Sequence, residues 1–176
     1  MAWQRAKVAI PKRFGPTERM AIAQEVIDFI VQRSKSGKAI NGSRFPAYSP
    51  GYRNSLDFKI AGKGSKVDLT LSGEMLDSIQ LLSDKSGEIT IGFDKSDTKL
   101  NGKAEGNQLG TYGHNTPLKG RARPFLGISA DDLKKITAKY PRAKDESIAR
   151  AQEELGAAKA AGDLVTGIDF NLDEEG

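Results

Sequence analysis

One segment constrains the fold more than any other: a helix predicted from Thr17 to about Ser36, with Gly37 as its stop. Threonine is a good N-cap residue, and glycine readily adopts the left-handed conformation in which many helices end. At 100° per residue, the apolar side chains fill an arc of about 200°, against roughly 100° for an ordinary surface helix. These side chains are Met20, Ile22, Ala23, Val26, Ile27, Phe29, Ile30 and Val31. A helix with so wide an apolar arc packs on two sides.

The second side of this helix has two possible partners. Both sides can be covered within the monomer, or one side can face a neighbouring subunit. Apolar residues make up only 38% of the 176 residues, which is lean for a chain of this length. Because few other apolar residues remain to cover the helix, we favour a neighbouring subunit, with Ile22 and Phe29 as candidate residues of the intersubunit face.

The middle of the chain predicts a small sheet and a second helix. Residues 67–71 and 89–93 alternate apolar with polar side chains, which is typical of half-buried strands. A short helical turn is predicted between them, at residues 72–79. A capping box at Ser129 opens a helix that ends before Pro141. The fold class is therefore α+β: a small antiparallel sheet packed by a long N-terminal amphipathic helix and a second helix.

Three further segments are predicted to lie outside this core. Residues 1–16 are basic and contain two prolines, which predicts an extended N-terminal arm. Residues 94–111 contain three glycines and almost nothing apolar, which predicts a long surface loop, mobile or ordered only by a neighbouring subunit. Residues 141–176 are predicted to form a helical extension, rich in Ala, Lys and Glu, with an acidic tail. The core domain then spans residues 17–140.

Charge is distributed unevenly along the chain. The net charge is +4, yet residues 1–66 hold 13 Lys/Arg against 4 Asp/Glu, and residues 124–176 hold 7 against 11. A basic front and an acidic end could steer subunits head to tail, or turn a basic face towards DNA. A solvated surface with uneven ends explains the same numbers equally well.

Neither a membrane span nor a signal peptide is predicted. No run approaches the roughly 20 apolar residues that a transmembrane helix needs. The first residues lack the apolar stretch of a signal peptide. We therefore expect assembly in a cytoplasm and no membrane partner.

Reactive groups are sparse. His114 is the only histidine and the chain has no cysteine, so a histidine-based triad, a multi-histidine metal site and thiolate chemistry are excluded. The neighbouring carboxylates Asp131 and Asp132 are better explained by helix capping. Residues 62–66 lack the glycine-lysine-serine spacing of a phosphate loop. We expect a protein that is not an enzyme and that uses no cofactor and no metal.

Four cations are candidates for binding. Arg121 and Arg123 flank a small residue before Pro124, so both side chains can project one way from an extended strand. Together with Lys99 and Lys103, they could contact carboxylates of an adjacent subunit or DNA that passes through a ring. Ordinary pairing within the chain is the alternative.

Residues 38–66 support a second functional hypothesis. Aromatic and basic residues are interleaved there, as in proteins that bind single-stranded nucleic acid. Pro46 and Pro50 indicate the commoner use, in which aromatic residues anchor an irregular loop. A basic nucleic-acid-binding module therefore remains an alternative function.

Three blocks of the chain together suggest a family. They are residues 45–52 (FPAYSPGY), residues 67–79 (VDLTLSGEMLDSI) and residues 120–129 (GRARPFLGIS), with Gly113 and His114 shortly before the third. In this order they resemble phage virion-morphogenesis proteins of the Mu type and the related tail-completion proteins of long-tailed phages. The resemblance covers about residues 17–140.

The resemblance implies a structural role in the virion of a tailed bacteriophage. It implies a small domain that forms a homo-oligomeric ring, most simply a hexamer, in the neck or at the top of the tail. Its partners would be head connector or adaptor proteins on one side and tail terminator, tube or sheath proteins on the other. DNA could pass through the channel, and assembly would take place in the host cytoplasm.

Overall fold

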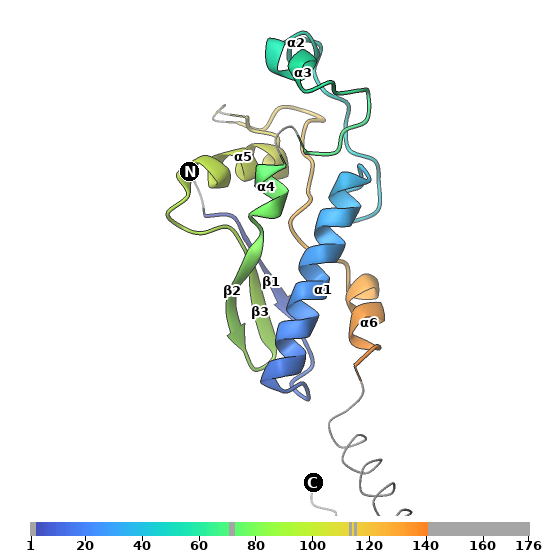
Figure 1. Ribbon diagram of the computed structural model, residues 1–176, viewed down its shortest axis with the longest axis vertical. Coiled ribbons are helices and arrows are strands. Elements are labelled where there is room, and N and C mark those ends of the chain that lie inside the picture. The colour runs from blue at the N-terminus through green and yellow to red at the C-terminus, as the bar shows by residue number, and fades with distance from the viewer. Residues whose placement is uncertain (1–2, 71–72, 113, 115, 141–176) are drawn as a thin grey trace, which may run out of the picture. The chain divides into compact units, whose positions relative to one another are not determined.

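The structure is a computed structural model, and it describes residues 3–70, 73–112, 114 and 116–140. This part of the chain contains three antiparallel strands, one long helix and several shorter helices (Figure 1). None of these helices is both long and apolar enough to cross a membrane. The predicted α+β class, with a small antiparallel sheet packed by helices, is confirmed. The predicted helical extension and acidic tail, residues 141–176, lie outside the described residues.

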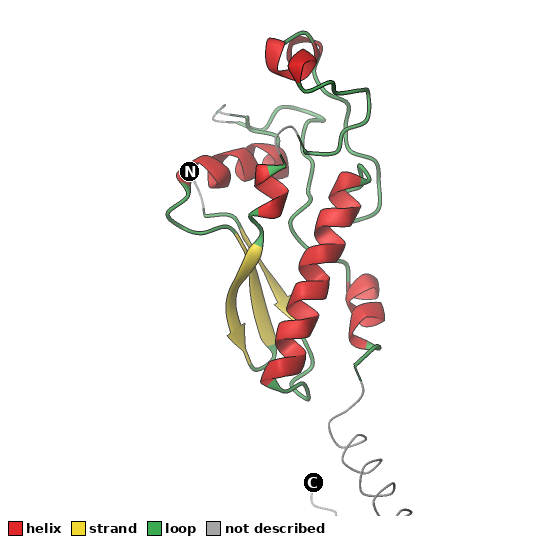
Figure 2. Cartoon of the chain, in the orientation of Figure 1, coloured by secondary structure: helices red, strands yellow, loops and turns green. Residues whose placement is uncertain are grey.

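The sheet has the strand order β1-β3-β2 (Figure 2). Strand β1 spans Arg5–Ala9, β2 spans Gln80–Lys85 and β3 spans Glu88–Gly92, and both pairings are antiparallel. The central strand β3 is the strand predicted at residues 89–93, displaced by one residue. Ile89 and Ile91 are completely buried, and Thr90 between them is buried too, so this central strand is covered on both faces and is not the half-buried strand predicted.

Strand β1 corrects the expectation that residues 1–16 form an arm outside the core. Val8 is 4% exposed, whereas Arg5 and Lys7 are exposed, so the basic residues occupy the solvent face of a core strand. Phe14, which follows the strand, is 2% exposed. The first residues therefore complete the sheet and the core.

Helix α1 spans Pro16–Lys35 and is the predicted long helix. Its first turn is closed by the Glu18 carboxylate, which accepts a hydrogen bond of 2.6 Å from the Gly15 N–H. Thr17, the expected N-cap, lies just inside the helix. Gly37 follows the helix with a φ of +84°, so the predicted stop is confirmed.

Most of the apolar arc of α1 is covered within the chain, although Met20 is 61% exposed. One side contacts β2 and β3, and the helix also contacts α6, which spans Ala130–Thr137. Ile22 is fully buried, so the prediction that it faces a neighbouring subunit is wrong. Phe29 is half-buried against the core, and the Arg33 guanidinium lies 5.6 Å from its ring centre. The lean composition misled the prediction because α6 supplies cover that had been assigned to another subunit.

Residues 94–111 are not a long surface loop. They contain helix α5, at Thr98–Leu109. The Asp97 carboxylate accepts a hydrogen bond of 2.8 Å from the Leu100 N–H and so caps the helix. Leu100 and Ala104 are buried in the core. The segment is therefore ordered by this chain, and the expectation that it needs a neighbouring subunit for order is wrong.

The strand expected at residues 67–71 is absent from its described part, residues 67–70. Leu69 has a φ of +57°, which breaks the extended conformation. Val67 and Leu69 are nevertheless buried, so their apolar character reflects core packing without a strand. Helix α4, at Glu74–Asp77, confirms the short helical turn predicted next in the chain.

Residues 45–63 form what we call the α2–α3 projection. It contains the short helices α2, at Pro50–Arg53, and α3, at Leu56–Ile60. Both helices lie beyond the C-terminal end of α1, far from the sheet (Figure 1). Hydrogen bonds join the projection to the segment that precedes α6 and to residues 68–70.

Candidate functional site

Three aromatic rings fold the α2–α3 projection onto itself. The ring centres of Tyr48, Tyr52 and Phe58 lie 5.2 to 5.4 Å apart in tilted and edge-to-face arrangements. Phe58 is only 6% exposed. Aromatic residues do anchor this segment, as predicted, but residues 50–53 and 56–60 are short helices and not an irregular loop.

Arg123 joins the projection to the body of the molecule. Its side chain is 5% exposed, and its Nε and Nη2 donate hydrogen bonds of 3.2 and 3.3 Å to the carbonyls of Pro46 and Ala47. Its Nη1 donates to Asn107 Oδ1 at 3.3 Å and to the Tyr112 hydroxyl. A buried guanidinium needs such acceptors, because its charge has lost the hydration of bulk water.

Two aromatic rings also flank this guanidinium. The Arg123 guanidinium carbon lies 5.1 Å from the ring centre of Tyr48 and 5.6 Å from that of Tyr112. The negative faces of aromatic rings attract a cation at such distances. The charge of Arg123 is therefore balanced by carbonyl oxygens and ring faces.

Arg121 reaches the same place. Its Nη1 donates a hydrogen bond of 3.1 Å to the Ala47 carbonyl, which Arg123 also contacts. The two side chains therefore project in one direction, as predicted, although residues 121–124 do not form a strand. Both arginines donate hydrogen bonds within the chain, which is the alternative that the sequence left open.

An ion pair holds the C-terminal end of the projection, at Lys63. Lys63 Nζ lies 2.9 Å from Asp68 Oδ1 and 2.6 Å from Thr70 Oγ1. Burial works to raise the pKa of Asp68, but hydrogen bonds from Lys63 and Thr70 outweigh it and lower the pKa. Asp68 is therefore a stable anion at neutral pH, and it ties residue 63 back to the body.

A second buried arginine holds the segment after Arg123. Arg33 of α1 donates hydrogen bonds of 2.6 and 2.8 Å from Nη2 to the carbonyls of Phe125 and Gly127. Burial lowers the pKa of Arg33, and the nearby Asp132 works in the opposite direction. This contact fixes the segment between Arg123 and α6.

An open cleft of about 650 Å³ lies beside this joint. Its walls include the apolar residues Leu69, Met75 and Leu118, and the cations Lys103, Arg121 and Arg123. Among the described residues, no Asp or Glu lines it. The cleft therefore combines apolar walls with positive charge.

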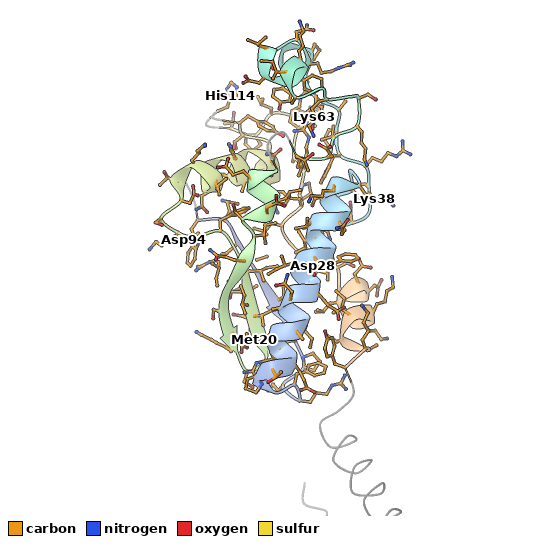
Figure 3. The ribbon with its side chains drawn as sticks, viewed as in Figure 1. Met20, Asp28, Lys38, Lys63, Asp94 and His114 are labelled. Atoms are coloured by element: carbon orange, nitrogen blue, oxygen red, sulfur yellow. The ribbon has the colours of Figure 1, made fainter. Side chains whose placement is uncertain are left out.

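Tyrosine hydroxyls add polar groups to the same cleft. Tyr48, Tyr52 and Tyr112 all line it, and burial raises the pKa of each phenol. These phenols stay protonated at neutral pH and act as neutral donors. His114 also lines the cleft, and Figure 3 shows it at the end of the molecule that carries Lys63, opposite Met20.

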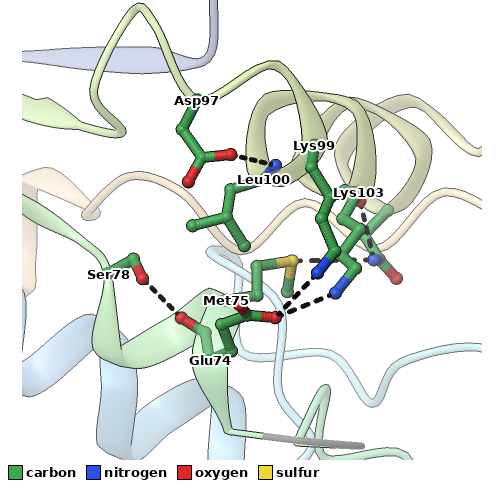
Figure 4. Close-up of polar contacts among 8 residues, drawn as sticks. Glu74, Met75, Ser78, Asp97, Lys99, Leu100 and Lys103 are labelled. Atoms are coloured by element: carbon green, nitrogen blue, oxygen red, sulfur yellow. Dashed lines mark hydrogen bonds and ion pairs between the residues drawn. The ribbon is translucent and has the colours of Figure 1, made fainter.

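Lys99 and Lys103 lie side by side on α5 and share one carboxylate. Their Nζ atoms are 3.7 and 3.2 Å from Glu74 Oε2 on α4 (Figure 4). Both lysine side chains remain substantially exposed, at 70% and 42%. Ion pairs this exposed stabilise a fold little, so the two cations stay accessible to other anions. Their role as subunit or DNA contacts stays a prediction.

The cleft offers several binding groups. The described residues contain no group of three or more His, Cys, Asp or Glu side chains that could hold a metal ion. The arginines and tyrosines of the cleft are neither nucleophiles nor proton carriers near neutral pH. The arrangement can position a surface and bind an apolar or anionic group.

Sequence reasoning missed one exposed apolar feature. Leu56 and Ile60 of α3 are 70% and 75% exposed, although both are large and apolar. They are four residues apart, so they share one face of the helix. Phe58 is turned to the opposite side and is buried. We call Leu56 and Ile60 the α3 knob, and only their spacing around a buried aromatic residue could have signalled it.

The three sequence blocks thus converge on one joint. Residues 45–52 receive the arginines of residues 120–129, and Asp68 and Thr70 hold Lys63. Comparison with known proteins finds no matching family model, no matching curated protein and no matching solved structure.

Proposed function

We propose that this chain is a structural subunit of the neck of a tailed bacteriophage. It completes the tail, or joins the head connector to the tail, as one member of a homo-oligomeric ring. The observation that carries this proposal is the joint at Arg123, where the sequence blocks that resemble the virion-morphogenesis proteins meet. Segments separated along the chain come together there to hold the α2–α3 projection in place.

The groups at this joint support a structural role. Arg121 and Arg123 bind main-chain carbonyls, and Lys63 binds Asp68 and Thr70. Hydrogen bonds of this kind fix the position of a segment. A projection held so firmly presents its outer surface to a partner at a defined place.

The partners follow from the proposed location. A neck subunit contacts further copies of itself, the connector or adaptor proteins of the head, and the terminator, tube or sheath proteins of the tail. Lys99 and Lys103 are exposed cations that could face DNA in the channel or acidic groups of a neighbour. The hexameric number remains part of the proposal.

The nucleic-acid alternative gains no specific support. A platform that binds single strands needs aromatic faces open to stacking bases. Tyr48, Tyr52 and Phe58 pack against one another, and Arg123 is buried. The aromatic residues of this region are thus used inside the molecule, whereas the basic residues Lys38, Arg44, Arg53, Lys59 and Lys66 are exposed.

The proposal is tested by deleting the gene from a phage that encodes this chain. DNA-filled heads and separate tails, or tails of abnormal length, are expected in electron micrographs, with few joined particles. An intact gene supplied in trans should restore joining, and antibody to the purified chain should label the neck of complete virions. Normal infectious particles, or empty heads without packaged DNA, would show that the neck assignment is wrong.

A further inference from the structure

We infer that the α3 knob of one copy binds the cleft of the next copy, giving a head-to-tail contact between identical chains. The inference rests on the proposed ring for its biological setting, and its geometry comes from two surfaces of the monomer. One surface is a pair of exposed apolar side chains, and the other is an open cleft with apolar walls.

The α3 knob has the character of an interaction surface. Leu56 and Ile60 are the most exposed of the large apolar side chains in the described part of the chain, at 70% and 75%. They stand on a helix that packs through Phe58 on Tyr48 and Tyr52 of the same projection. Arg123 attaches that projection to the body. Fixed, clustered apolar side chains on a projecting helix are typical of an interaction surface.

The cleft matches the knob in chemistry. Leu69, Met75 and Leu118 give it apolar walls, and its volume of about 650 Å³ has room for two aliphatic side chains. Asp57 lies next to Leu56 on α3 and is exposed. Lys59, which lies next to Ile60, is exposed too. Asp57 of an incoming knob would meet Arg121 or Lys103, and Lys59 would meet Glu74, which lies 3.2 Å from Lys103 beside the cleft.

The knob cannot fill the cleft of its own chain. Phe58 faces Tyr48 and Tyr52, which line the cleft, and the knob lies on the opposite face of the same short helix. The knob and the cleft are therefore two different surfaces that point apart. A contact between different surfaces of identical chains is heterologous, and it closes into a ring when the rotation between copies allows.

The contact is small, so we expect it to form only where the local concentration of copies is high. Two apolar side chains and two flanking charges bury less than the roughly 1,000 Å² that a stable interface in solution usually needs. Free copies should then associate weakly. Copies that collect on a tail end or a connector reach a high local concentration, and there the contact would link neighbours.

Cysteine pairing tests this contact directly, because the chain has no natural cysteine. Purified Ile60→Cys and Leu118→Cys chains are mixed at about millimolar concentration and oxidised. Since each chain carries one thiol, every disulfide joins two copies. The 60–118 disulfide should form several-fold more than a 20–118 disulfide from Met20→Cys, which is 61% exposed on α1 at the opposite end of the molecule.

Two results would overturn the inference. One is a 60–118 yield no higher than the 20–118 control. The other is an excess of 60–60 disulfide, which would mean that two knobs meet symmetrically. A Leu56→Asp/Ile60→Asp chain should also lose weak self-association in sedimentation, whereas Met20→Asp should retain it.

The outcome is separable from that of the proposed function. Neck labelling by antibody without 60–118 pairing would reject the knob contact and leave the neck assignment intact. Strong 60–118 pairing with no label on virions would reject the neck assignment and leave a self-associating protein.

Discussion

The guanidinium carbon of Arg123 lies 5.1 Å from the ring centre of Tyr48, which belongs to a segment far away in the sequence. The same guanidinium donates to the carbonyls of Pro46 and Ala47. One side chain therefore provides both the charge and the hydrogen-bond donors that attach the α2–α3 projection. The stability of the projection should depend on it strongly.

Replacing Arg123 with alanine should lower the free energy of unfolding by about 2–4 kcal/mol, because buried carbonyls lose their donor and a cavity opens. Urea unfolding measures the loss, and hydrogen exchange should speed up in residues 45–63. Arg121→Ala is the matched control, since Arg121 is half-exposed and reaches the same carbonyl of Ala47. Equal losses in the two variants would show that Arg123 is not the main attachment.

The sequence was sufficient where local periodicity and packing agree. Apolar spacing predicted α1 and alternation predicted β3, because their large apolar residues recur at the helical and the strand period. Capping chemistry at Ser129 predicted α6, where the Ser129 hydroxyl does accept a hydrogen bond from the Asp132 N–H. Each of these signals lies within a few consecutive residues.

The elements that were missed depend on distant parts of the chain. α5 buries Leu100 and Ala104 against the core but is otherwise polar, so its pattern is too weak to show a helix. β1 is short and its exposed positions include basic residues, so the sequence resembled a charged arm. Its pairing with β3 shows that it is a strand. Leu69 alternates as a strand residue would, yet its φ of +57° is set by tertiary packing.

The candidate site was only partly predictable for the same reason. The direction shared by Arg121 and Arg123 followed from their spacing. Their acceptors at Pro46 and Ala47 did not, because no local pattern links segments so far apart. Burial of Ile22 was likewise hidden, since the cover that α6 gives to α1 is a tertiary fact.

Gly110 ends α5 with a φ of +76°, and a Cβ there would lie 2.7 Å from the Ala122 nitrogen. Gly110→Ala should therefore destabilise the fold through both backbone strain and a clash. Gly42 is the matched control, because its φ is +81° and a Cβ there meets nothing within 4 Å. Gly42→Ala should cost about 1 kcal/mol from strain alone, and Gly110→Ala clearly more, as measured by urea unfolding. Equal costs would mean that the segment at Ala122 moves aside freely.

The Tyr140 hydroxyl donates a hydrogen bond of 2.6 Å to Glu25, and this bond raises the pKa of Tyr140 to about 12. An unfolded tyrosine titrates near pH 10. The folded pKa is the higher one, so the stability that the bond contributes is full below pH 10 and is lost as the pH rises towards 12. Hydrogen bonds from Lys139 and Tyr140 lower the pKa of Glu25, so at the acid end the contribution falls as Glu25 becomes protonated.

A double-mutant cycle of Tyr140→Phe and Glu25→Ala measures this bond by urea unfolding. The coupling energy should be largest near neutral pH and should shrink between pH 10 and the highest pH at which the chain remains folded. Spectrophotometric titration of the phenols should show that the most basic tyrosine is missing in Tyr140→Phe. A coupling energy that stays constant across this range would contradict the assigned bond.

The last prediction concerns a chain that ends at Tyr140. Residues Met1–Tyr140 form one compact unit, and in it Ile136 is 5% exposed and Tyr140 contacts both Glu25 and Phe14. The shortened chain should therefore fold, with a Tm within about 5 °C of the full chain, a shift that corresponds to about 1 kcal/mol or slightly more. A chain that ends at Ser129 is the control: it loses α6, uncovers one side of α1, and should be strongly destabilised. In an infection, the chain ending at Tyr140 should yield fewer joined particles than the full chain if residues 141–176 contact a neck partner. An unfolded Met1–Tyr140 chain would show that the unit does not stand alone, and normal joining by a folded one would remove the assembly role from residues 141–176.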